Sequence, residues 1–306
     1  MVGVMTNETA SPSIQNGRGI ALMACGMFLF SAVDTMAKVL TETVHPMQVV
    51  WLRQSGLLLG ALVLLLRFGR GHLATQRPGL QISRGLCAIV SAAAFITAIR
   101  YVPLADAVAV SFIAPFIVTV LGAVLLREPV GLRRWTAVFI GFLATMVIIR
   151  PGQGAMHPAI LLVLLAASVF ALRQVLSRIL GATEKSTTTF AYTAIVGWFV
   201  LLLPLPFVWT WPSTGLEVGL MVAMAVLAAI AEFMVIKALE LAQSVAVAPV
   251  HYTILIWSTA YGFLVFGHLP DGWTVLGASV IMLTGLYTLH RESLADRARR
   301  VPPPAG

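Results

Sequence analysis

Ten apolar stretches, each close to the length that crosses a lipid bilayer, fill almost all of this 306-residue chain. A spanning helix needs about 20 apolar residues, because each residue adds about 1.5 Å along the axis. Only 10% of the residues are charged, whereas soluble domains carry about 25%. Ten such stretches without an amphipathic face argue against the buried helices of a soluble protein. The sequence therefore predicts an all-α integral membrane protein.

Breaks at charge clusters, prolines and glycines divide the chain into ten expected transmembrane helices. They are 19–40, 46–66, 82–100, 104–126, 134–149, 158–180, 188–208, 217–239, 244–266 and 273–289. Only short turns separate them, so successive helices are expected to pack as antiparallel neighbours. Outside them we expect a disordered cytoplasmic N-terminus at 1–17 and a basic, disordered cytoplasmic tail at 291–306.

The basic residues fall mainly on one side of the expected membrane. With the N-terminus inside, 15 of the 20 Lys and Arg residues lie in cytoplasmic segments, and three, Lys38, Arg100 and Arg150, lie on the opposite side. Because basic loops are retained in the cytoplasm, this bias predicts cytoplasmic termini in a multi-pass protein of the cell inner membrane. The net charge of +8 reflects this asymmetry and does not indicate nucleic-acid binding.

The second half of the chain weakly repeats the first. Residues 98–110 and 235–247, at a constant offset of 137, share six identities in 13 columns. At an offset of 140, Phe30 meets Phe170, and basic residues at span ends also match in the same order. Chance similarity between apolar helices is the competing explanation, and the matched basic residues argue against it.

Five spans in each repeat have a consequence for topology. Because five is odd, the second repeat must insert upside down relative to the first. We therefore expect two inverted five-helix repeats, at 18–150 and 151–290. Inverted repeats are the architecture of secondary transporters, which place the substrate site near the membrane midplane between the halves.

Several motifs resemble the drug/metabolite transporter superfamily, EamA type, over roughly residues 18–290. They are Phe30–Lys38 in the first span, Tyr101–Ala107 at the fourth, and Arg127–Pro129 before a Trp at the fifth. The resemblance implies transport of an amino acid, purine, nucleotide sugar, vitamin or other metabolite. The chain departs from the family at Gly267–Pro270, where an acidic residue often precedes the tenth span.

Four ionisable residues lie deep inside expected spans: Asp34, Arg53, Arg173 and Glu232. Each costs about 2.5–3.5 kcal/mol at a helix centre, so each is expected to face a cavity or a partner. Counting residues along helices that alternate in direction places Asp34 and Arg53 in the outer half of the membrane. The same count places Arg173 and Glu232 in the inner half. Two interpretations stay open: structural ion pairs, or a polar cavity that binds substrate or carries a proton.

Other span residues are weaker candidates for the site. His251 either packs through a hydrogen bond or titrates near neutral pH. Tyr192, Tyr252 and Trp257 either line the cavity and stack on a planar ligand or simply pack.

Four residues are predicted to shape helices, and one to reach the headgroups. Pro115 and Pro249 are expected to kink their helices, because proline removes a backbone hydrogen bond. Gly56 and Gly60 form a GxxxG motif that favours close helix approach. Lys38, near a span end, is expected to extend to the lipid headgroups.

The function predicted from these features is secondary transport of a small organic metabolite by alternating access. We expect coupling to protons, with Glu232 as the first titrating candidate and His251 as the second, no cofactor, and a monomer or homodimer. Charges of both signs suit a zwitterionic or polar planar substrate. The alternatives are an intramembrane enzyme, with a catalytic pair drawn from Asp34, Glu232 or His251 but no known motif, and a channel without a recognisable filter. The sequence has no P-loop.

Overall fold

The computed structural model describes residues 16–69, 73–127, 130–150, 157–181, 183–242 and 244–300. All regular structure in these ranges is α-helical, which confirms the predicted all-α class. The predicted N-terminal segment 1–17 lies outside the described residues, apart from Asn16 and Gly17 in the first helix. The tail predicted to be disordered is helical through Arg300, because the last helix continues past the membrane segment.

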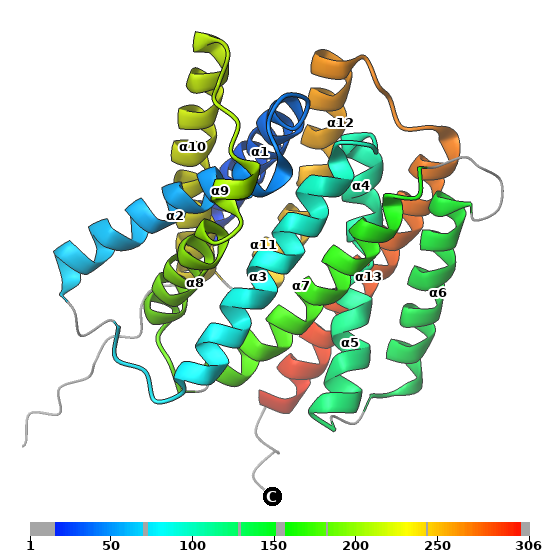
Figure 1. The fold of residues 1–306 in the computed structure, drawn as a ribbon. Helices are drawn as coiled ribbons and strands as arrows, with labels where there is room; N and C mark the ends of the chain where they lie inside the picture. Colours follow the sequence, from blue (N-terminus) through cyan, green and yellow to red (C-terminus); the bar gives the residue numbers. More distant parts are fainter. Residues whose placement is uncertain are drawn as a thin grey trace, which may run out of the picture.

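The helices follow one another along the chain with short connections between them (Figure 1). They are α1 (Asn16–Leu40), α2 (Pro46–Phe68), α3 (Pro78–Ile99), α4 (Leu104–Ser111), α5 (Ala114–Leu125), α6 (Leu132–Ile149), α7 (Ile160–Gly181), α8 (Ser186–Leu202), α9 (Leu205–Val208), α10 (Gly215–Leu241), α11 (Ser244–His251), α12 (Thr253–Phe266) and α13 (Gly272–Arg300).

Seven segments in the described residues are long and apolar enough to cross a membrane. They are Asn16–Leu40, Pro46–Arg67, Pro78–Ile99, Leu104–Leu125, Leu132–Ile149, Ile160–Gly181 and Gly215–Leu239. The apolar helices at Ser186–Leu202 and Gly272–Thr288 are shorter than these. The chain is therefore a multi-pass membrane protein.

Local sequence explains where several helices begin and end. His45 caps α2 by accepting a hydrogen bond from Met47 N at 3.3 Å. Thr214 caps α10, and its Oγ1 accepts from Glu217 N at 3.2 Å. Gly267 ends α12 with φ +69°, a left-handed conformation that suits glycine.

The helices of the two halves interlock in a matched pattern. α1 packs against α10, α11 and α12, while α7 packs against α3, α4 and α5. α2 contacts α8 and α10, α3 contacts α7 and α8, and α6 pairs with α13. The fourth apolar segment of each half is broken in the same way, into α4 with α5 and into α11 with α12.

Hydrogen bonds between the segments that connect the helices identify the two ends of the bundle. At one, which we call the Lys38 end, α1 finishes, and Gln48 Nε2 at the start of α2 donates to Thr210 O (2.9 Å). At the other, the Glu184 end, Thr75 Oγ1 donates to Glu184 Oε1 at 2.9 Å and joins the α2–α3 and α7–α8 connections. The Lys38 end is uppermost in Figure 1, and the C-terminal end of α13 lies at the bottom.

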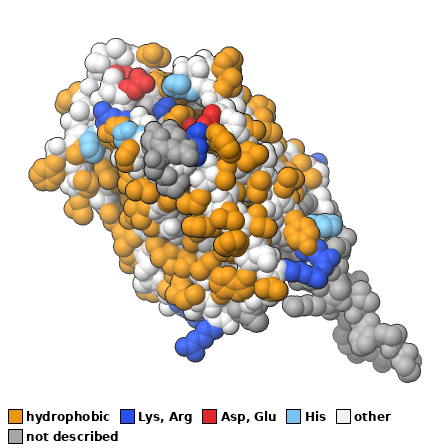
Figure 2. Space-filling view, turned by 90° about the vertical axis from the view of Figure 1, so that its right-hand side faces the viewer, with side chains coloured by type: hydrophobic (Ala, Val, Ile, Leu, Met, Phe, Trp, Pro, Cys, Tyr) orange, Lys and Arg blue, Asp and Glu red, His pale blue; other side chains and the backbone are white. Residues whose placement is uncertain are grey.

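The outer surface between the two ends is apolar. Figure 2 shows hydrophobic side chains over the middle of one face, with charged and histidine side chains gathered toward its upper and lower ends. Large hydrophobic side chains are exposed on several helices, among them Leu59, Val63, Phe139, Leu143 and Leu283. In water such a surface would drive association, whereas in a bilayer it meets acyl chains.

Gly56 allows α2 and α10 to approach closely. A Cβ atom at this position would lie 1.8 Å from Ala225 O of α10. Gly60, one turn further along α2, is less restricted, because its nearest neighbours would be 3.8 Å away. Of the two glycines in the predicted GxxxG motif, Gly56 is therefore the one that lets α2 lie against the backbone of α10.

We expect Gly56→Ala to lower the thermal stability of the purified protein, because the new methyl group meets a backbone carbonyl that cannot rotate away. The expected loss is about 1–3 kcal/mol, typical of overpacking. Gly60→Ala is the matched control and should leave the unfolding temperature in detergent nearly unchanged. Equal unfolding temperatures for the two variants would contradict this view of the crossing.

Candidate functional site

Asp34 of α1 and Arg53 of α2 form an ion pair inside the bundle. Arg53 Nη1 lies 3.2 Å from Asp34 Oδ1, and the Asp34 side chain is buried. The Arg53 guanidinium also lies over the Phe30 ring, 5.6 Å from its centroid. Since Phe30 and Asp34 are one helical turn apart, both hold the same guanidinium from one face of α1.

Arg173 of α7 is the second cation of the site, and it is partly buried. Its guanidinium lies 4.7 Å from the centroid of the Phe170 ring, and its Nε is buried without a hydrogen-bond partner in the described residues. It interacts electrostatically with Glu232 of α10 and with Arg53. Arg173 therefore interacts with a member of each predicted pair, but among the described residues no carboxylate lies within ion-pair distance of it.

Arg84 of α3 completes this group, and it was not among the residues predicted from the sequence. Its Nε donates to Ser177 Oγ at 2.7 Å, and its Nη1 donates to Thr193 Oγ1. It also interacts electrostatically with Arg173 and Glu232. The sequence placed Arg84 with the cytoplasmic residues because it is only the third residue of the expected span 82–100. In the structure α3 begins at Pro78, so Arg84 lies more than one turn inside the helix.

We call these five residues the central charge cluster: Asp34, Arg53, Arg84, Arg173 and Glu232. When all are ionised, three cations and two anions leave a net charge of +1 (3 − 2). They come from α1, α2, α3, α7 and α10, so helices from both halves contribute. A cluster with one cation in excess and aromatic rings beside two guanidinium groups favours a ligand with a carboxylate and an apolar ring.

The two broken helices meet at their breaks. Phe112 lies between α4 and α5, and Tyr252 lies between α11 and α12; their ring centroids are 4.9 Å apart. His251 is exposed, and its ring meets Phe112 edge-on at 6.4 Å. Pro115 is the second residue of α5, just after its break, and Pro249 lies inside α11, just before the other.

Two predicted aromatic residues have different surroundings. Tyr192 Oη donates to Leu73 O at 3.3 Å, so it is directed to the α2–α3 connection at the Glu184 end. Trp257 packs with Met23 and Met27, and its ring meets Phe28 edge-on at 5.0 Å. Within the described ranges, no group of three or more His, Cys, Asp or Glu residues is arranged to hold a metal ion.

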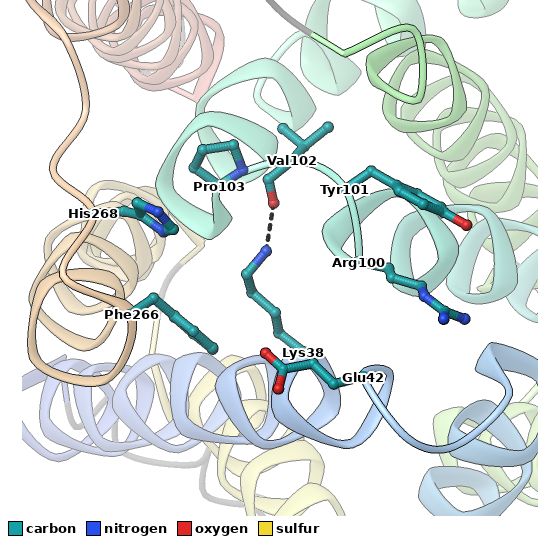
Figure 3. Close-up of a pocket in the computed structure, with 8 residues that line it drawn as sticks. All are labelled: Lys38, Glu42, Arg100, Tyr101, Val102, Pro103, Phe266 and His268. Carbon is teal, nitrogen blue, oxygen red and sulfur yellow. Dashed lines mark hydrogen bonds between the residues drawn. The ribbon is translucent and has the colours of Figure 1, made fainter.

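A separate cavity of about 310 Å³ opens at the Lys38 end (Figure 3). We call it the Lys38 pocket. Its lining residues are Lys38, Glu42, Arg100, Tyr101, Val102, Pro103, Phe266 and His268. The prediction that Lys38 extends to the headgroups is wrong: the residue is buried and Nζ donates to Ile99 O and to Val102 O, the latter at 2.7 Å. The α3–α4 turn offers carbonyl acceptors closer than the lipid surface.

An ion pair between Arg150 and Asp271 links the α6–α7 and α12–α13 connections at the same end. Burial raises the pKa of Asp271, but hydrogen bonds from Thr274 and Arg150 lower it by more, so the pKa lies below its usual value. Asp271 is therefore ionised at neutral pH and holds the two connections together.

Comparison with known proteins gives a consistent result. The family model described as "EamA-like transporter family" matches residues 17–150. The chain is 27% identical to an S-adenosylmethionine uptake transporter of Rickettsia prowazekii over 274 residues, 90% of this chain and 93% of the relative. It is 30% identical to a riboflavin transporter of Vibrio cholerae over 233 residues, 76% of this chain and 78% of the relative.

Two further matches extend this result. A pseudopaline exporter of Pseudomonas aeruginosa is 24% identical over 271 residues, 87% of this chain and 93% of the relative. A solved crystal structure matches with a TM-score of 0.61 at 17% identity, over 90% of this chain and 98% of the other. At that identity the structural match shows a shared fold only.

The Asp34–Arg53 pair predicts a strong coupling between two substitutions. Asp34→Asn and Arg53→Gln should each destabilise the protein by on the order of 3 kcal/mol, because each leaves one buried charge without its partner. The double variant should lose much less than the sum of the two. Unfolding free energies measured in mixed micelles test this, and simple additivity would show that the two side chains do not depend on each other.

Proposed function

This chain belongs to the EamA-like transporter family, and from that premise we propose that it carries a zwitterionic metabolite with a planar ring. It is a transporter of a small metabolite rather than an enzyme.

The observation that carries the proposal is the composition of the central charge cluster. Arg173 has a buried Nε without a partner among the described residues, and the cluster has one positive charge in excess, so a ligand carboxylate would complete it. Glu232 offers a partner for a ligand ammonium, and the rings of Phe30 and Phe170 offer apolar surfaces beside the guanidinium groups. S-adenosylmethionine, named for the Rickettsia relatives, combines an α-amino-acid group with a planar base and also carries a sulfonium cation, a group that aromatic rings such as those of Phe30 and Phe170 can face.

We also propose that the route is alternating access by two inverted five-helix repeats, with ten membrane crossings in total. The matched packing of α1 with α10, α11 and α12, and of α7 with α3, α4 and α5, supports this arrangement. The Glu184 end then faces the cytoplasm with both chain termini, and the protein lies in the inner membrane of a bacterium, as basic-residue bias and bacterial relatives favour.

Protons are the proposed driving ion, with Glu232 as the group that takes them up. Protonation of Glu232 would raise the net charge of the cluster from +1 to +2 (3 − 1) and would strengthen its attraction for a ligand carboxylate. His251, exposed beside the broken helices, is the second candidate.

Uptake into proteoliposomes tests the substrate. Labelled S-adenosylmethionine should accumulate, and Arg173→Gln should reduce its uptake at least about tenfold, because a charge-assisted hydrogen bond to the carboxylate is lost. Riboflavin, which has no carboxylate, is the competing substrate. Saturable riboflavin uptake that is unaffected by Arg173→Gln would contradict the proposed substrate class.

The same vesicles test the role of Glu232. An imposed pH gradient should stimulate uptake by the parent protein, and Glu232→Gln should abolish that stimulation while leaving exchange without a gradient measurable. His251→Gln is the comparison variant. If Glu232→Gln keeps its full response to the gradient and His251→Gln loses it, the proton site is His251.

A further inference from the structure

The Lys38 pocket lies apart from the central charge cluster and has no part in the function proposed above. It is formed where the end of α1, the α3–α4 turn and the end of α12 come together (Figure 3). Its volume of about 310 Å³ is near the lower limit of small-molecule sites, which begin at about 300 Å³. A pocket of this size suits a ligand no larger than an amino acid.

Lys38 gives the pocket a fixed cation. Two backbone carbonyls, those of Ile99 and Val102, accept hydrogen bonds from Nζ and hold it in place. An ammonium group has three N–H donors, so one donor remains. Among the described residues no carboxylate lies within ion-pair distance of Nζ, although Glu42 and Asp106 both act on it electrostatically.

Glu42 supplies the opposite charge. It follows Lys38 by one helical turn, and Figure 3 shows its carboxylate directed into the pocket beside the Lys38 side chain. Glu42 is exposed, and within the described residues its carboxylate forms no ion pair. The Phe266 ring, 5.3 Å from Lys38 Nζ, and the His268 ring form the wall opposite the α3–α4 turn.

We propose that the Lys38 pocket binds the α-amino-acid group of a small metabolite, with the ligand carboxylate on the Lys38 ammonium and the ligand ammonium on the Glu42 carboxylate. Neither group has an ion-pair partner of its own within the described part of the chain, and both charges of the ligand would be matched. The Phe266 ring then contacts the aliphatic part of the ligand. The proposal does not rest on the central charge cluster or on the substrate proposed for it.

Isothermal titration calorimetry of the full chain in detergent tests the site with three probes. L-methionine carries both charged groups, methylthiopropylamine lacks the carboxylate, and methylthiobutanoate lacks the ammonium. L-methionine should bind at least about tenfold more tightly than either of the others, because each missing group removes a charge-assisted hydrogen bond. Equal binding of all three probes, or no binding of L-methionine, would overturn the proposal.

Glu42→Gln locates the binding in this pocket. Because Glu42 is exposed, the variant should fold; it should bind L-methionine about tenfold more weakly and methylthiobutanoate as tightly as the parent does. Glu184→Gln, at the opposite end, is the control and should change neither affinity. Repeating the titrations in Arg173→Gln removes binding at the central cluster, so loss of transport and loss of this site are distinguishable. An unchanged preference for L-methionine in Glu42→Gln would assign the binding to another place.

Discussion

An ionised side chain in the hydrocarbon of a bilayer costs about 2.5–3.5 kcal/mol unless it faces a polar partner, and the arrangement of the inner helices reflects that cost. Asp34 and Arg53 bring α1 against α2. Glu232 of α10 interacts electrostatically with Arg84 of α3 and Arg173 of α7, one cation from each half. Lipid provides no hydrophobic force that would drive the helices together. The attraction between them must therefore come from close packing at glycines and from these polar interactions.

The breaks in the two discontinuous helices give the bundle a second point of contact between its halves. Phe112 and Tyr252 are 140 residues apart, the same offset that relates Phe30 to Phe170, and their rings pack together. Space for Tyr252 comes from α13, where a Cβ atom on Gly285 would lie 2.0 Å from the tyrosine hydroxyl. The backbone at both breaks stays in the right-handed helical region, so each break is a tightened turn rather than an unwound segment, and both lie on helices that pack between the halves.

The sequence alone predicts the all-α class and the charged residues deep in the spans, because an isolated Asp or Arg is easily recognised within an apolar stretch. It was insufficient for Arg84 and Lys38, which lie near span ends where an Arg or Lys normally reaches water. Whether such a residue turns inward depends on acceptors from distant segments, such as Ser177 for Arg84 and the carbonyl of Val102 for Lys38. Composition and helical periodicity carry no information about those acceptors.

For a carrier that alternates as proposed, the closures at the two ends must be similar in free energy. At the Glu184 end, Glu184 accepts from Thr75 Oγ1 and Gln76 N, both at 2.9 Å. At the Lys38 end, three hydrogen bonds join Gln48 and Thr210, Lys38 donates to two carbonyls, and Arg150 pairs with Asp271. Each such hydrogen bond contributes about 0.5–1.5 kcal/mol net, so the contacts at either end contribute on the order of several kcal/mol. A ligand that binds the two states with a difference of that size is enough to reverse which end is open.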